Sequence, residues 1–375
     1  MRKYLINLTL LFLIVVLILA FPIVCLVKAG EIYPYSYYTH PLQEKQLFGL
    51  AYSYYDKPYK LSMSNYYKPD VLALGSSRIL TFRENIVKEN LTFYNAGGAI
   101  QNIYELSQFM RQCTFTPKLV LVNLDQWWFN PNYQNQKQEF SEQIFEEPAW
   151  NVSKIINCCR DFCYDFLDGK VVLDSLWNSS HIGLNAICKH NGFAKDGTRN
   201  TENLFYDPAY IQEHFEETFS RINEGNRRFE YGAHADSSVA EAIELFLKKC
   251  ESRGIIVVAF IPTFAPSVCR KMRDMGKYAY MQEIKGIVAP CFKRHQNCYL
   301  YDYTDMKNMG IQDCDFTDGF HGSVLVSNAI LQLILRQNQA IRKYFITDEA
   351  LDSLSTVYRQ QFHLDNPKLR QLKIE

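Results

Sequence analysis

The sequence predicts an α/β protein whose core is a mostly parallel sheet of about five strands. Five short runs are almost continuously apolar, which is typical of strands that are buried on both faces. Segments with helical periodicity lie between several of these runs, and this alternation favours a parallel sheet covered by helices. The expected strands are 71–74, 91–94, 119–122, 255–261 and 299–303, and the clearest helices are 238–251 and 324–336. We therefore expect a three-layer α/β/α sandwich.

The composition is that of a globular protein and argues against a nucleic-acid partner. The 375 residues are 47% apolar and 21% charged, and 40 Lys and Arg residues are balanced by 40 Asp and Glu residues. Proteins that bind nucleic acids normally carry a basic excess, which is absent here. Eleven cysteines in this length are too few for a disulfide scaffold, and their spacing leaves any pairing open.

The N-terminus predicts a membrane anchor. Residues 5–27 contain no charged side chain, and an apolar helix of about 20 residues spans the ~30 Å hydrocarbon core of a bilayer. Arg2 and Lys3 precede this run, which favours a cytoplasmic N-terminus and an extracytoplasmic main domain. We expect a single-pass signal-anchor transmembrane helix over residues 1–28, in the cell membrane. A cleaved signal peptide and a reversed topology are the alternatives.

The next segment, residues 29–69, is rich in tyrosine. Tyrosine suits the water–lipid interface because its ring is amphipathic, so we expect a juxtamembrane segment here. A stalk that packs on the main domain is the alternative. The tyrosines are Tyr33, Tyr35, Tyr37, Tyr38, Tyr52, Tyr54, Tyr55, Tyr59, Tyr66 and Tyr67.

The rest of the chain is expected to form one main domain, residues 70–345, with a peripheral helix within 346–375. The alternation of strands and helices is interrupted at about 125–232, where there are helical pieces but no strong strand. We expect this part to be a long helical insertion that covers one edge of the sheet.

Candidate catalytic residues follow the first and the last expected strand. In open parallel sheets, reacting groups gather beyond the carboxyl ends of the strands. The first strand leads into the sequence Gly-Ser-Ser-Arg, whose second serine is Ser77, and helix-start N–H groups at such a turn stabilise a developing oxyanion. The last strand is followed by Asp318 and His321. The carboxylate can hold the imidazole while the second ring nitrogen takes the serine proton.

Other interpretations of these three residues stay open. Ser77 would also suit the N-cap of a helix, where serine is favoured. His321 would also suit a hydrogen-bonded loop position, and Asp318 the cap of the helix that follows it.

Three further residues are candidates for substrate binding. Arg78 would bind an anionic substrate group or, alternatively, form a structural ion pair. Trp127 and Trp128 follow the third strand, where they would stack on a sugar ring or pack under the insertion.

Two other classes of site lack support in the sequence. The serine turn lacks the second glycine of the nucleophile elbow, which disfavours the α/β-hydrolase fold. The glycine-rich motifs of dinucleotide and phosphate-binding loops do not occur.

Taken in order, these blocks resemble the SGNH/GDSL hydrolase superfamily. The similarity covers about residues 70–130 and 254–335 and looks most like the membrane-anchored branch tied to acyl transfer on surface polymers. That branch includes teichoic acid D-alanyl-transfer proteins and alginate O-acetylation accessory proteins. The residues that carry the resemblance are Gly75-Ser76-Ser77-Arg78, then Tyr94-Asn95-Ala96-Gly97-Gly98, then Asp318-x-x-His321.

The resemblance implies a flavodoxin-like sheet and a role for each matching residue. Ser77 would be the nucleophile, His321 the proton carrier and Asp318 the residue that orients it, with no metal or organic cofactor. The family's Gly-x-Asn-Asp block is absent, and Asn123 stands at the corresponding strand end. The implied oxyanion donors are Ser77, Gly97, Gly98 and Asn123.

The function that the resemblance implies is that of a bacterial serine esterase or O-acyltransferase. Its substrate would be an O-acyl group of a cell-envelope glycan, and its partners would be that glycan or its acyl donor. A polytopic membrane acyltransferase would be a further partner. The alternative is a catalytically silent protein of the same fold that binds polysaccharide or an envelope assembly partner.

Overall fold

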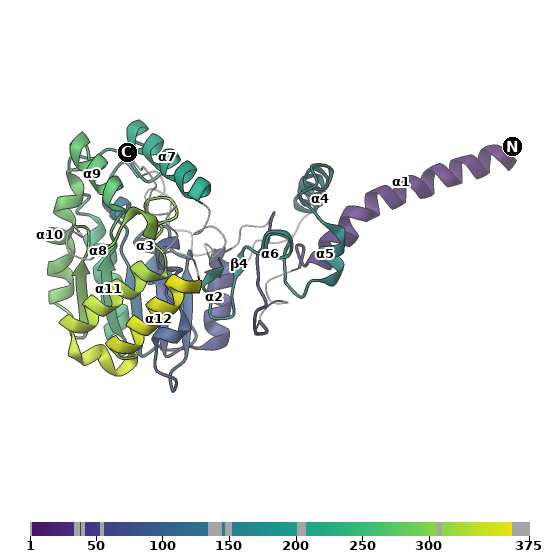
Figure 1. Cartoon of the computed structure of the whole chain (residues 1–375). Helices are drawn as coiled ribbons and strands as arrows, with labels where there is room; N and C mark the ends of the chain where they lie inside the picture. Colours follow the sequence, from purple (N-terminus) through teal and green to yellow (C-terminus); the bar gives the residue numbers. More distant parts are fainter. Residues whose placement is uncertain are drawn as a thin grey trace. The chain divides into compact units, whose positions relative to one another are not determined.

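The computed structural model describes residues 2–33, 38, 42–52, 56–133, 145–146, 152–200, 208–305 and 310–361 (Figure 1). Its contacts divide the chain into two compact units. Unit 1 comprises residues 1–55 and 146–195, and unit 2 comprises residues 56–145 and 196–375. The middle of the expected insertion therefore groups with the N-terminal residues and not with the sheet, which differs from the expected domain boundaries.

Unit 2 contains a five-stranded parallel sheet, which confirms the predicted α/β fold. Its order is β2-β1-β3-β6-β7. Numbered along the chain, the second strand lies outermost beside the first, as in the flavodoxin-like order. The strand order reverses its direction between β1 and β3, which makes this the topological switch point of the sheet. Ligands of open α/β sheets bind at such a point, so the carboxyl ends of β1 and β3 mark the expected site. The strands are β1 (Val71–Gly75), β2 (Phe93–Gly97), β3 (Leu119–Asn123), β6 (Ile256–Ile261) and β7 (Cys298–Asp302).

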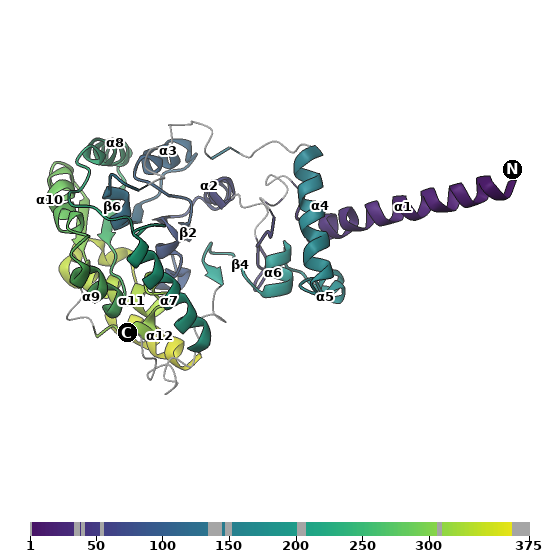
Figure 2. The same ribbon diagram turned by 90° about the horizontal axis from the view of Figure 1, so that it is seen from above.

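Helices cover both faces of this sheet (Figure 2). On one face α3, α8 and α10 pack side by side, whereas α11 lies on the other face with α12 packed on it. The helices of unit 2 are α2 (Asp56–Tyr67), α3 (Tyr104–Gln112), α7 (Pro208–Glu224), α8 (Val239–Glu251), α9 (Pro266–Met275), α10 (Tyr280–Lys293), α11 (Val324–Gln337) and α12 (Asp348–Gln361). The expected C-terminal helix is thus α12, and residues 362–375 lie outside the described residues.

The core of unit 2 follows from the apolar periodicity of these elements. Every residue of β1 and β3 is buried, as expected of central parallel strands. In α8 the buried residues Ala242, Phe246 and Cys250 recur every four positions and form one stripe. Because the core residues hold the strands in register, their carboxyl ends are fixed relative to one another.

Unit 1 is a smaller, mainly helical body. The last turns of α1 bury Cys25, Leu26 and Ala29 in a core that also contains Phe162. Glu31 is buried behind them and accepts hydrogen bonds from the N–H groups of residues 51 and 184, and burial raises its pKa to about 7. The helices are α1 (Arg2–Ala29), α4 (Val152–Leu167), α5 (Leu173–Asn178) and α6 (Leu184–Lys189), followed by β4 (Gly192–Phe193) in unit 1 and β5 (Arg199–Asn200) in unit 2.

Two expectations for the N-terminal part have different outcomes. Within the described residues no helix has both the length and the apolarity needed to cross a membrane, so the transmembrane helix expected over 1–28 is not supported. The apolar run is nevertheless helical, as α1. Of the expected juxtamembrane tyrosines, Tyr35, Tyr37, Tyr54 and Tyr55 lie outside the described residues.

Candidate active site

The turn after β1 places Ser77 at the carboxyl edge of the sheet. β1 ends at Gly75, and the chain enters a short 3₁₀ helix, Ser77–Ile79. Gly75 leaves room for a neighbour, because a Cβ atom here would lie 1.8 Å from Oδ1 of Asn123. The short helix is capped by Ser76, whose Oγ accepts a hydrogen bond from the N–H of Arg78 at 3.1 Å. Ser76 therefore takes the N-cap role considered for Ser77.

The hydroxyl of Ser77 instead contacts His321. Its Oγ lies 2.7 Å from Nε2 of His321, and Nδ1 of the same ring lies 2.7 Å from Oδ2 of Asp318. The second carboxylate oxygen accepts the backbone N–H groups of Phe320 and His321 at 3.2 and 2.8 Å. The structure thus brings together the three residues predicted to be catalytic, and the carboxylate is fixed relative to the ring it holds.

The electrostatics of this chain of contacts favour an ionised carboxylate. Burial acts to raise the pKa of Asp318, but the interaction with His321 and the backbone hydrogen bonds outweigh it, so the pKa lies below its ordinary value. An ionised Asp318 accepts a hydrogen bond from Nδ1–H of His321 and so leaves Nε2 as the acceptor for the serine proton. The His321 side chain is 27% exposed, so a substrate can approach it.

The loop that carries this pair is held by α7 and α9. The hydroxyl of Thr218 on α7 donates to the carbonyl of Asp318 at 2.7 Å. Gly319 has a φ of +87°, and a Cβ atom there would lie 2.6 Å from Val268, so this position requires glycine. The sequence analysis did not identify Thr218 or Gly319, although an Asp-Gly pair is a turn signal. The helix α11 is capped by Ser323, not by Asp318.

Two of the four predicted oxyanion donors are used inside the protein. The N–H of Gly97 donates to Oδ1 of Asn95 at 2.7 Å. The side-chain amide of Asn123 donates to Oγ of Ser76 at 3.1 Å and to Oδ1 of Asp125 at 2.9 Å. Both groups therefore shape the strand ends and are not directed at a substrate.

The other two predicted donors are available. The backbone N–H groups of Ser77 and Gly98 form no hydrogen bond within the part of the chain that the structure describes. Gly98 has a φ of +83° and only one atom within 4 Å of its ideal Cβ position. These two N–H groups are the candidates for stabilising an oxyanion at Ser77.

Arg78 is buried, and each of its three guanidinium nitrogens donates within the protein. Nε donates to the carbonyl of Phe320 at 2.9 Å, and Nη2 donates to the carbonyl of Thr263. Nη1 donates to Oε1 of Gln126 at 2.8 Å and lies 3.4 Å from Oδ1 of Asp125. This arrangement agrees with the ion-pair interpretation and offers no donor for an anionic substrate group.

These contacts make Arg78 a positioning residue. It links the turn after β1 to the ends of β3 and β6 and to the loop before His321. Its guanidinium carbon lies 5.4 Å from the ring centre of Trp127 and 4.5 Å from that of Phe264. Burial lowers the pKa of Arg78 and raises that of its partner Asp125, because each charged form is removed from water.

The two tryptophans proposed for sugar stacking do not present a surface. Trp127 is 2% exposed and Trp128 is 1% exposed. Trp127 packs edge-on against Phe320 with ring centres 6.2 Å apart. Both rings therefore fill the core below the site, so the packing interpretation describes them and the stacking interpretation is wrong.

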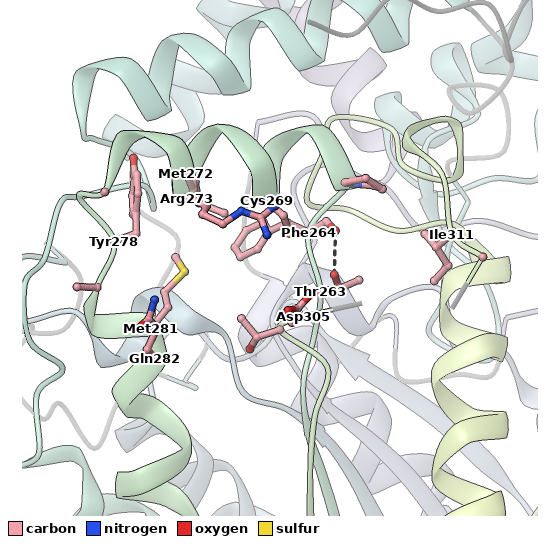
Figure 3. Close-up of a pocket in the computed structure, with 15 residues that line it drawn as sticks. Thr263, Phe264, Cys269, Met272, Arg273, Tyr278, Met281, Gln282, Asp305 and Ile311 are labelled. Carbon is pink, nitrogen blue, oxygen red and sulfur yellow. Dashed lines mark hydrogen bonds between the residues drawn. The ribbon is translucent and has the colours of Figure 1, made fainter. Parts of the chain in front are cut away.

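A cavity of about 550 Å³ lies beyond the carboxyl ends of β6 and β7 (Figure 3). None of Ser77, Asp318 and His321 lines it. Figure 3 shows the hydroxyl of Thr263 donating to the carbonyl of Phe264, a bond of 2.8 Å that closes one wall. The lining residues are Thr263, Phe264, Pro266, Cys269, Met272, Arg273, Gly276, Tyr278, Ala279, Met281, Gln282, Thr304, Asp305, Gly310 and Ile311.

Comparison with protein-family models gives no match, and comparison with curated proteins gives no similar sequence. The chemistry of the site is therefore inferred from the residues themselves.

Proposed function

We propose that this protein is a serine-dependent esterase or O-acyltransferase of the SGNH type, acting on an O-acyl group of a cell-envelope glycan. The observation that supports the proposal is the continuous contact from Ser77 through His321 to Asp318, with both distances at 2.7 Å. A nucleophile, a base and a residue that orients the base are the parts needed for covalent acyl transfer.

In the first half of the proposed reaction, Oγ of Ser77 attacks the acyl carbonyl carbon. Its proton passes to Nε2 of His321, whose Nδ1–H remains bonded to Asp318. The carbonyl oxygen gains negative charge and accepts hydrogen bonds from the N–H groups of Ser77 and Gly98. As the bond to the alcohol breaks, His321 returns its proton to the leaving oxygen, and an acyl-Ser77 ester remains.

In the second half, His321 takes a proton from an acceptor hydroxyl, which attacks the acyl-Ser77 ester. Water as acceptor gives a carboxylic acid, and a glycan hydroxyl gives a new ester. The serine recovers its proton from His321 in both cases. A metal ion or organic cofactor has no step in this sequence.

We also propose that the active domain faces the outside of a bacterial cell membrane, to which the N-terminal segment attaches it. The support is the charge-free run at residues 5–27, preceded by Arg2 and Lys3. This location agrees with a glycan substrate and with a polytopic acyl-donor partner in the same membrane. An alkaline-phosphatase reporter at the C-terminus should be active, and an inactive reporter with a stable fusion would contradict the orientation.

A second candidate function is a catalytically silent protein that binds polysaccharide or an assembly partner. The observation that favours it is the internal use of the Gly97 N–H and the Asn123 amide. Loss of one oxyanion donor typically costs about 10²–10³ in rate. In this case Ser77→Ala would leave binding and cellular function intact.

Fluorophosphonate labelling of the purified full chain, read by intact mass, separates the two functions. We expect one adduct on Ser77, because an activated serine attacks phosphorus as it attacks a carbonyl carbon. Ser77→Ala should carry no adduct, and Ser237→Ala is the matched control because it removes an exposed serine hydroxyl elsewhere in unit 2. Absence of an adduct from folded protein would support the silent function, as would an adduct that persists in Ser77→Ala.

A further inference from the structure

Most apolar side chains that the described residues expose belong to unit 1. In unit 2 the exposed large hydrophobic residues are Tyr66, Leu245 and Val357, and all others found among the described residues lie on α1 or within 152–177. Soluble proteins rarely expose contiguous apolar surface, and larger patches mark binding sites. The apolar surface of unit 1 therefore needs an occupant.

The helix α4 is amphipathic, with a second apolar face turned away from its core. At about 100° per residue, four of its exposed residues fall within roughly a third of the helix circumference. The opposite side buries Cys158 and Phe162 in the core of unit 1. The four exposed residues are Val152 (73% exposed), Ile156, Tyr164 and Leu167 (79% exposed).

Further exposed apolar residues lie on α5 and just before it. Val172, Leu173 and Trp177 are all exposed, and the Trp177 side chain is 50% exposed. Tryptophan and tyrosine are enriched where one end of a ring meets hydrocarbon and the other meets water. We name the exposed residues Val152, Ile156, Tyr164, Leu167, Val172, Leu173 and Trp177 the α4–α5 face.

The core side of α4 packs on the apolar N-terminal helix α1. Phe21 of α1 makes edge contacts with Phe162 and Phe166 of α4, with ring centres 6.0 and 5.3 Å apart. In both views α4 runs crosswise to α1 at the end where the two helices pack (Figures 1 and 2). If the exposed apolar N-terminal part of α1 contacts a bilayer, α4 lies crosswise to it, as an interfacial amphipathic helix would.

The charges near the face indicate which lipid surface it fits. Arg160 pairs with Asp161 at 2.8 Å, and Lys170 pairs with Asp165 and Asp168 at 3.2 and 3.0 Å. These two cations are therefore matched by carboxylates. Apolar contact, not attraction to anionic headgroups, would drive the binding.

We propose that the α4–α5 face lies in the interfacial region of a lipid bilayer and forms a second membrane contact beside α1. The inference rests on the membrane location given under the proposed function. It adds that unit 1 binds lipid directly through Trp177 and the apolar stripe of α4, with no requirement for anionic lipid.

The test uses the full chain in phosphatidylcholine vesicles with ordinary or brominated acyl chains. Bromine quenches tryptophan only at contact distance, and Trp127 and Trp128 are buried. All proteins in the test carry Trp150→Phe, so that the fourth tryptophan does not contribute to the signal. We expect brominated lipid to quench wild type more than Trp177→Phe. The double variant Ile156→Asp/Leu167→Asp should lose most of this Trp177 quenching, whereas exchange of the lipid for phosphatidylglycerol should not increase it.

The matched control is Leu245→Asp, because Leu245 is also 50% exposed but belongs to α8 of unit 2. It should leave the quenching unchanged. Equal quenching of wild type and Trp177→Phe would overturn the proposal, as would a crosslinked dimer joined through α4 in place of lipid contact. Fluorophosphonate labelling of the same samples tests the catalytic proposal separately, since Ser77 lies in unit 2.

Discussion

Replacement of Arg78 by methionine tests whether the buried guanidinium holds the catalytic loop. Methionine keeps the length and apolar contacts of the side chain between Trp127 and Phe264, but it removes the charge and every donor. The carbonyls of Phe320 and Thr263 lose their partners, and Asp125 loses its counter-ion.

The expected loss of stability follows from these contacts. Removal of one partner from a buried ion pair costs about 3–5 kcal/mol, and each orphaned buried carbonyl costs about 1–3 kcal/mol. Because these effects share one network and are not additive, we expect a loss of about 3–5 kcal/mol in the free energy of unfolding of unit 2. The labelling rate of Ser77 should also fall, since a shift of about 1 Å can cost about 10²-fold.

The loss should depend on pH with a defined sign. Burial raises the pKa of Asp125 even beside Arg78, and without the guanidinium the pKa rises further. The folded variant then binds a proton at pH values where the unfolded chain, with an Asp pKa of about 3.9, does not. Its stability relative to wild type should therefore recover as the pH falls.

The assay is urea denaturation of the full chain, in which proteolysis reports the unfolding of unit 2. It compares Arg78→Met, Asp125→Asn and the double variant Arg78→Met/Asp125→Asn. The double variant should be more stable than the sum of the single losses predicts, by about 1–3 kcal/mol. Strictly additive losses, or a cost below about 1 kcal/mol for Arg78→Met, would refute the reasoning. Arg78→Lys, which keeps the charge but not the planar fork, should fall between wild type and Arg78→Met.

Three further predictions concern the site and the scaffold. Gly75→Ala should slow labelling of Ser77 by at least about 10-fold, because the added methyl group would lie 1.8 Å from an amide oxygen, whereas Gly286→Ala meets nothing within 4 Å and should label normally. Asp318→Asn should slow labelling by about 10²–10⁴-fold without unfolding the protein, because the imidazole loses its carboxylate; an unchanged rate would argue against that role. Burial acts to lower the pKa of His295, but its bonds to two carboxylates outweigh this and raise it. The stabilising effect of protonated His295 is therefore complete below about pH 6.5 and is lost as the pH rises through the raised pKa. Over this pH range the melting temperature should fall less in His295→Gln than in wild type.

The sequence was sufficient to predict the sheet and the position of the residues proposed to be catalytic. Continuous apolar runs mark strands buried on both faces, and their ends locate Ser77 and His321 at one edge. The second strand was expected at 91–94 but covers Phe93–Gly97. The apolar pattern missed this shift because Asn95 lies in a buried strand, where its amide is satisfied by two backbone carbonyls.

The remaining features depend on contacts between residues far apart in the sequence, which no local sequence pattern indicates. Arg78 meets partners from three other segments, so its burial was not evident from its position after a strand. The same is true of Trp127, whose position at a strand end did not indicate whether its ring faces solvent or core. Residues 146–195 group with the N-terminal residues, although the sequence between them contains three strands of the sheet.

We propose that His321 activates Ser77, and the rate of Ser77 phosphonylation measures this activation. The measurement compares wild type with His321→Ala at equal fluorophosphonate concentration, with the adduct mapped by peptide mass. We expect a rate at least about 10²-fold lower in His321→Ala, because the base lies at Nε2, 2.7 Å from Oγ of Ser77. Equal rates in two folded proteins would contradict it and leave Ser77 as an ordinary serine at a strand end.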